Sequence, residues 1–175
     1  MRTALFALAI FLSTASVPVG TLEERSQVDE FMVVRGSGYE GVVVQASSPS
    51  HQLYKMGVPP GTLASSPWTP SSEDIAALES ALAIFLAGEG PIIVDSRILE
   101  RPQVRQTINA LKRQYFGIHI GNSRHVIVHG VPERLARDRW RSEVILMTDG
   151  GCENSWFDFD VDAQRVLWLL CGGTA

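Results

Sequence analysis

Apolar residues repeat at helical spacing in two segments of the chain. In residues 71–87 they fall three or four positions apart, which places them on one face of a predicted helix: Ile75, Leu78, Leu82, Phe85 and Leu86. Serine and acidic residues at its start and Gly88 after its end are typical helix boundaries. Residues 102–115 show the same spacing, so we predict a second helix there.

From residue 116 to the C-terminus, apolar residues alternate with polar ones. This period of two indicates β-strands, and turn-forming residues such as Asp149-Gly150-Gly151 separate the runs. Strands that follow one another through short turns pair antiparallel. We therefore predict an antiparallel β-meander of four to five strands, at about residues 116–120, 126–128, 144–146, 155–160 and 166–171.

The segment before the first helix has a different character. Residues 31–35 and 42–46 are predicted as a hairpin around the glycine-rich turn 36–41, and the prolines and serines of residues 47–70 predict a long loop. The fold class is then α+β, with two helices packed on the C-terminal meander. We expect residues 16–70 to belong to the same domain as the meander of residues 71–175.

The first fifteen residues have the pattern of a secretory signal peptide. One arginine precedes an unbroken apolar run from Ala4 to Leu12, and Ser13-Thr14-Ala15 supplies small residues for cleavage. The run is about half of the roughly 20 residues that span a bilayer, so no integral membrane span is expected after cleavage. This predicts a periplasmic or secreted protein; the alternative is a buried N-terminal core helix.

Composition narrows the function classes. The apolar fraction is 45% and the formal net charge is −4, which is typical of a folded domain rather than a disordered one. Nucleic-acid binding normally requires a basic surface, so no nucleic-acid partner is expected. No cofactor or metal is predicted.

The final hairpin allows a prediction about the two cysteines. If Phe159 lies opposite Val166, then Phe157 lies opposite Trp168, and these residues with Leu170 share the core face. Cys152 and Cys171 then lie on the other face, one diagonal step apart. An exported chain with two cysteines favours a disulfide, and a bulge at Gly150-Gly151 would close the remaining distance.

The same register places Trp156, Leu167 and Leu169 together on the second face of the hairpin. Large apolar side chains there have two explanations. Either the N-terminal third of the chain covers them, or they are an exposed patch that binds a partner.

Several short motifs occur in order along residues 70–175: Arg113-Gln114-Tyr115-Phe116-Gly117-Ile118, Trp140, Asp149-Gly150-Gly151, Trp156-Phe157 and Gly173-Thr174-Ala175. As a set they resemble a group of small exported bacterial proteins that share R-Q-Y-x-G-I, a D-G-G turn and an N-G-x-A ending. The resemblance implies location and architecture, and no established activity comes with it. Here Gly172 stands where the ending usually has asparagine.

Motifs for chemistry are incomplete. The G-x-G-x-x-G run of residues 36–41 precedes valines that favour a strand rather than the helix a dinucleotide site needs. His119 and His125 could meet across a turn, but no further ligand completes a metal set. We therefore expect a non-catalytic domain of the cell envelope that binds a protein or envelope partner or acts as an inhibitor. The alternative is a small envelope-acting hydrolase that uses the carboxylates of Asp149 and Glu153.

Overall fold

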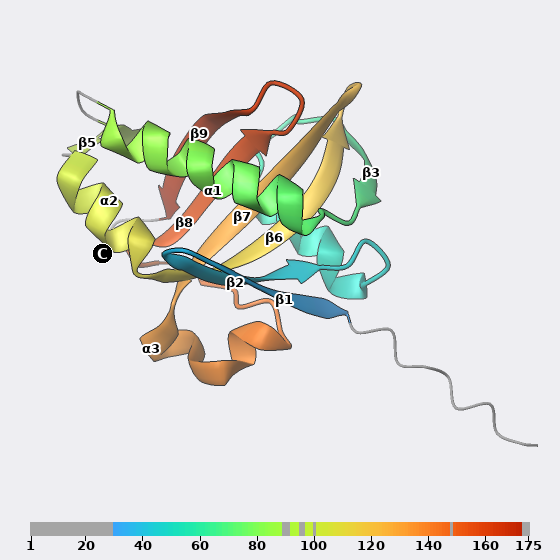
Figure 1. The fold of residues 1–175 in the computed structure, drawn as a ribbon, viewed down its shortest axis with the longest axis horizontal. Coiled ribbons are helices and arrows are strands. Elements are labelled where there is room, and N and C mark those ends of the chain that lie inside the picture. The colour runs from blue at the N-terminus through green and yellow to red at the C-terminus, as the bar shows by residue number, and fades with distance from the viewer. Residues whose placement is uncertain (1–29, 89–91, 95–96, 100, 148, 173–175) are drawn as a thin grey trace, which may run out of the picture.

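The computed structural model describes residues 30–88, 92–94, 97–99, 101–147 and 149–172 (Figure 1). The predicted signal peptide, residues 1–15, and the residues 173–175 of the C-terminal motif lie outside this part of the chain. None of the helices within it is long and apolar enough to cross a membrane.

A mixed sheet of seven described strands forms the centre of the molecule. Its order is β1-β2-β6-β7-β8-β9, and β3 pairs with the part of β6 that β2 leaves free. The strands are β1 (Phe31–Gly36), β2 (Tyr39–Val44), β3 (Ala64–Trp68), β6 (Leu111–Ile120), β7 (Ser123–Pro132), β8 (Gly151–Asp160) and β9 (Arg165–Gly172).

The last four strands form the predicted antiparallel meander. The N-terminal hairpin joins the same sheet, because β2 pairs parallel with β6. Gly41 permits this pairing: a Cβ atom at this position would collide with the Arg113 carbonyl oxygen and the Tyr115 ring. The broad α+β class is thus confirmed, while the sheet is larger than the predicted meander.

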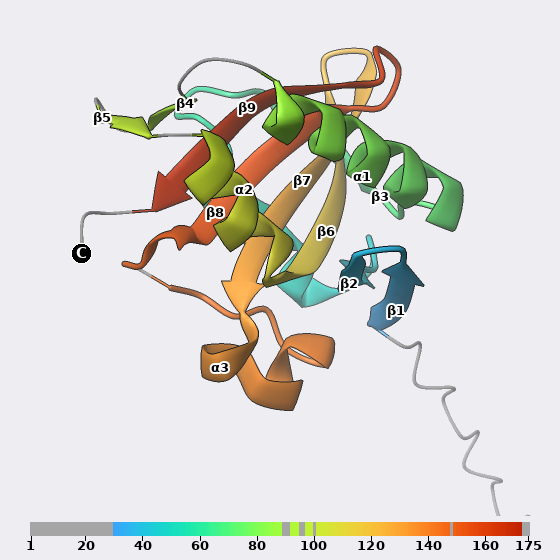
Figure 2. The ribbon, with the colours of Figure 1, turned by 60° about the vertical axis from the view of Figure 1, so that its left-hand side comes forward.

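Two helices cover one face of the sheet (Figures 1 and 2): α1 (Ser72–Ala87) and α2 (Arg101–Asn109). Ser71 caps α1 through a reciprocal pair of hydrogen bonds with Asp74, which satisfies amides at the helix start. The predicted stripe on α1 is buried against the sheet: Ile75, Leu78, Leu82 and Leu86. Each such side chain contributes roughly 1.5–3 kcal/mol when buried, so packing rather than helix propensity positions α1.

Shorter elements cover the opposite face. They are the 3-10 helix η1 (Pro49–Met56), the helix α3 (Glu133–Ala136) and the 3-10 helix η2 (Arg137–Arg141). Two apolar clusters lie beneath them, one around Trp140 and one around Phe116 and Trp156. A separate two-stranded hairpin consists of β4 (Ile92–Val94) and β5 (Arg97–Leu99).

Three predicted elements are corrected. The second helix ends at Asn109, and residues 111–115 begin β6 instead. The first part of β6 is central in the sheet and buried on both faces. Its apolar residues therefore do not alternate with polar ones, and their spacing is similar to that of a helix. Residues 144–146 are not a strand; the Ile145 amide donates to the side-chain oxygen of Gln114 instead of to a backbone carbonyl of a neighbouring strand. The predicted loop 47–70 contains η1 and β3.

The register of the last hairpin also differs from the prediction. Phe159 does lie opposite Val166, but Phe157 lies opposite Leu169 rather than Trp168. The reason is a bulge at Leu167, which moves every following residue of β9 to the other face. Leu169 and Cys171 therefore join the core beneath the helices, while Trp168 packs against the opposite cluster.

Candidate functional site

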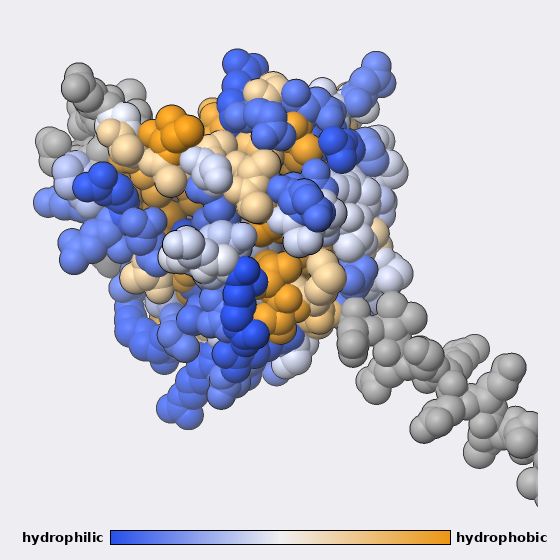
Figure 3. Space-filling view, in the orientation of Figure 1, coloured by the Kyte–Doolittle hydropathy of each residue, from blue (hydrophilic) through white to orange (hydrophobic). Residues whose placement is uncertain are grey.

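A cleft of about 570 Å³ lies where α1, the tip of the β1–β2 hairpin, the end of α2 and the start of β6 meet. Its lining combines small and polar side chains: Ser37, Gly38, Tyr39, Ala76, Glu79, Ser80, Leu82, Ala83, Asn109 and Arg113. Figure 3 shows this side of the molecule, where separate apolar patches over α1 and over the hairpin alternate with polar surface.

A buried ion pair forms the base of the cleft. The Arg113 Nε atom lies 2.9 Å from the Glu79 Oε1 atom, and the two side chains are only 2% and 9% exposed. Arg113 also donates a 2.9 Å hydrogen bond from Nη1 to the Leu111 carbonyl oxygen. Its Nε group makes no hydrogen bond of good geometry, so its contact with Glu79 is mainly electrostatic. The cleft thus contains two opposite charges that neutralise each other.

Two tyrosines complete this polar cluster. The Tyr115 hydroxyl donates a 2.8 Å hydrogen bond to Glu79 Oε1. Burial raises the pKa of Glu79, against the opposing influence of Arg113 and Tyr115. Burial and the Glu79 charge also raise the pKa of Tyr39 and of Tyr115. Both phenols therefore remain protonated hydrogen-bond donors at neutral pH.

The R-Q-Y run of β6 explains why these groups converge. Arg113 and Tyr115 point to the helix-covered face, whereas Gln114 points to the other face because side chains alternate along a strand. Gln114 donates to the carbonyl oxygens of Trp140 and Glu143 and accepts from the Ile145 amide. Arg113 and Tyr115 thus contribute polar groups to the cleft region, while Gln114 holds the segment between η2 and β8 in place.

Sequence reasoning missed this cleft. Arg113 falls in the predicted helix of residues 102–115 and Glu79 in that of residues 71–87, and neither has a predicted role in a site. No local signal marks the pair, because Arg113 stands between Lys112 and Gln114 and its partner is 34 positions away on a predicted helix.

The predicted patch of Trp156, Leu167 and Leu169 does not form. Trp156 is 7% exposed and lies under η1, Leu169 is 5% exposed and lies under the helices, and only Leu167 is exposed. The bulge in β9 separates them. Of the two explanations left open for Trp156, coverage by the N-terminal third is the one the structure shows.

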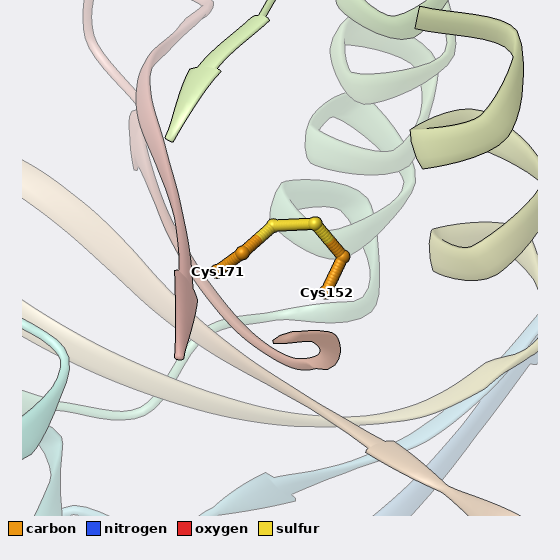
Figure 4. The surroundings of a disulfide bond; sticks show 2 residues. All are labelled: Cys152 and Cys171. Atoms are coloured by element: carbon orange, nitrogen blue, oxygen red, sulfur yellow. A yellow bond between two sulfur atoms is a disulfide. The ribbon is translucent and has the colours of Figure 1, made fainter. Parts of the chain in front are cut away.

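The cysteine prediction is confirmed: Cys152 and Cys171 form a disulfide, with their Cα atoms 4.3 Å apart. Figure 4 shows the bridge joining the start of β8 to the end of β9. The pairing is irregular between Gly151 and Ser155, just after Gly150-Gly151, where the bulge was predicted. The bridge lies on the helix-covered face, because Cys171 follows the bulge in β9.

The residues of the predicted alternative chemistries are not brought together. Glu153 pairs with Arg134, while Asp149 is exposed and is not among the residues that line the pocket beside Glu153. His119 contacts Ser66, whereas His125 pairs with Asp158. Within the described residues, no group of three or more potential ligands is arranged to hold a metal ion.

The His125–Asp158 pair predicts a pH-dependent contribution to stability. Burial lowers the pKa of His125, but the 3.0 Å hydrogen bond to Asp158 and the charges of Asp158, Asp160 and Asp162 outweigh it and raise the pKa overall. The stabilisation is fully present below the unfolded-state pKa of about 6.5 and is lost as pH rises through the folded-state value.

We therefore expect His125→Gln to lower the free energy of unfolding more at about pH 6 than at about pH 9, as measured by urea denaturation. The matched control is His119→Gln, the same substitution at a surface histidine whose contact is Ser66 rather than a carboxylate. An equal loss at both pH values for His125→Gln would contradict the ionic role of the pair.

Comparison of the chain with models of protein families, with curated proteins and with solved structures found no match. The geometry of the cleft is therefore the main basis for a functional proposal.

Proposed function

We propose that the protein is an exported, non-catalytic binding domain that takes a small polar ligand without net charge into the cleft between α1 and the β1–β2 hairpin. The observation that carries this proposal is the buried Arg113–Glu79 pair at the base of a cleft of about 570 Å³. The ligand site of the predicted binding domain is then this cleft, and not the patch that was predicted on the last hairpin.

The size of the cleft supports a small ligand. Pockets for small molecules usually measure about 300–1,000 Å³, so this cleft has room for one such molecule or for one unit of a larger envelope polymer. Stable protein–protein interfaces need roughly 800 Å² of flat, complementary surface per partner. The apolar patches over α1 and β1 centre on separate exposed residues such as Ile84 and Val33.

The charges in the cleft support a ligand without net charge. An anion bound by Arg113 would leave the Glu79 carboxylate without its partner, and a cation bound by Glu79 would do the same to Arg113. A ligand with hydroxyl or amide groups can form hydrogen bonds with Asn109, Ser80 and the Tyr39 hydroxyl without separating the ion pair. The same mutual neutralisation argues for binding rather than catalysis, because each charge is already engaged by the other.

Export is supported by independent features. They are the signal-like pattern of residues 1–15, the Cys152–Cys171 disulfide, and the resemblance to small exported proteins. The hydrolase alternative has weaker support, because Glu153 pairs with Arg134 and, among the described residues, Asp149 does not line the pocket beside Glu153.

Filling the cleft tests the proposal. We expect neutral sugars, amides or short neutral peptides, screened by calorimetry, to yield a ligand whose affinity falls at least about tenfold in Ala83→Phe. Ala83 lines the cleft on the exposed side of α1, so the added ring occupies ligand space without touching the core.

Ala87→Phe is the matched control, since Ala87 is exposed on the same helix but is not part of the lining. Both variants should keep the circular dichroism spectrum of the parent. A ligand that binds Ala83→Phe and the parent equally well would overturn the assignment of the site.

A further inference from the structure

Residues 45–63 lie across the second face of the sheet and connect β2 to β3. We call this segment the lid. Its first two residues are held to other elements: the Gln45 amide donates to the Glu30 carbonyl oxygen, and the Ala46 amide donates to the Thr69 hydroxyl. After these residues it consists of η1 and turns, and it contributes no strand to the sheet. The sheet can therefore remain paired if the lid moves.

The lid covers aromatic side chains of β6 and β8. Gly57 lies directly against the Trp156 ring, and any Cβ atom at this position would collide with it. Tyr54 and Val58 pack against the cluster formed by Phe116, Ile127 and Trp156. The contact is apolar and depends on close approach of the backbone.

A buried histidine lies on each side of this contact. His51 belongs to the lid and is 2% exposed, with its ring edge-on to Phe116 at 5.9 Å. His129 belongs to β7, is 0% exposed, and stacks on Trp156 with ring centroids 4.0 Å apart. One ring nitrogen of each has no hydrogen-bond partner: Nε2 of His51 and Nδ1 of His129.

These surroundings disfavour a charge on either imidazole. Burial lowers the pKa of His129 to about 4, although the hydrogen bond with Asn154 opposes it. Burial also lowers the pKa of His51, against the influence of the Gly117 backbone. Charged groups on the neighbouring elements are exposed or have other partners. Lys55 is exposed, and Glu30 accepts a hydrogen bond from Ser48. The ion pairs are Arg124 with Asp74 and Asp162, His125 with Asp158, and Arg134 with Glu153.

We propose that residues 45–63 form an acid-released lid, which leaves Trp156 and Phe116 when His51 and His129 become protonated while the sheet stays folded. In the open lid both imidazoles reach water and can carry a charge. A histidine whose folded-state pKa is depressed stabilises the closed form above about pH 6.5, and this contribution is lost as pH falls toward 4. For His129 alone, lowering the pH to about 5 shifts the equilibrium about 30-fold toward the open form.

The test is an NMR titration of the ¹⁵N-labelled protein from about pH 8 to pH 4. We expect amide signals of the lid to lose their dispersion reversibly between about pH 6.5 and 4, while signals of β6, β7 and β8 remain. Gly57→Ala should give the open-lid signals already at pH 8, because its methyl group cannot fit against Trp156.

In the variant His51→Phe/His129→Phe the lid transition should move below pH 4, since neither ring can then be charged. His119→Gln is the control and should titrate as the parent does. Simultaneous loss of lid and sheet signals would overturn the proposal, as would lid signals unchanged at pH 4 or a transition that the double variant does not move.

Discussion

Arg113→Met is expected to lower the free energy of unfolding by about 3–5 kcal/mol, because it leaves the Glu79 carboxylate buried without its countercharge. Methionine keeps much of the aliphatic volume, so loss of packing contributes little. Urea denaturation at neutral pH measures the change. The loss should shrink in acid, because Glu79, whose pKa burial already raises, can then take up a proton.

The double variant Arg113→Met/Glu79→Leu should recover most of this loss, since replacing both members of a buried pair with apolar residues is often neutral. It should also lose any ligand that depends on the polar base of the cleft. Arg35→Met is the matched surface control: Arg35 pairs with Glu40 at 2.8 Å but is 65% exposed, so little change is expected. A change for Arg113→Met as small as that of the control would contradict the importance of the buried pair.

Cys152→Ala/Cys171→Ala is expected to lower the free energy of unfolding by about 3 kcal/mol. The bridge joins residues 19 positions apart, and closing a loop of this length restricts the unfolded chain by about that amount. Cys171 is also buried in the core beneath the helices. Thermal unfolding monitored by circular dichroism measures the change.

Treatment with a reducing agent should destabilise the parent by a similar amount and leave the cysteine-free variant unaffected. If reduction of the parent does not change the unfolding temperature, the bridge does not form in solution. That outcome would also weaken the proposal that the protein works outside the cytoplasm, because disulfides persist mainly in oxidising compartments.

Local patterns in the sequence were sufficient for several elements. The helix α1 follows from its stripe of apolar residues, its Ser71 cap and the glycine at its end, all of which act within one segment. The antiparallel pairs β6–β7 and β8–β9 follow from alternation and short turns, whereas β7 and β8 are joined by residues 133–150, where a further strand was predicted. The pairing of the two cysteines required only the hairpin and an exported chain.

Other features depend on contacts between segments distant in sequence. The boundary between α2 and β6 was predicted wrongly because residues 111–115 are buried by neighbours on both faces, which removes the alternation that marks a strand. The predicted binding patch failed because the single extra residue in β9 reverses the orientation of every side chain after it.

The proposed site also combines features that follow from local sequence with features that depend on distant contacts. The sequence alone placed Arg113 and Tyr115 in one short motif and Glu79 on an amphipathic helix, but nothing local indicates that they meet. Their contact arises because α1 packs across the face of β6 from which Arg113 and Tyr115 project. Likewise, a proline- and serine-rich run predicts a loop, and only packing on Trp156 decides where that loop lies. Local preferences along the chain suffice for an element such as α1, whereas the start of β6, the cleft and the position of residues 45–63 are set by burial, which requires the whole fold.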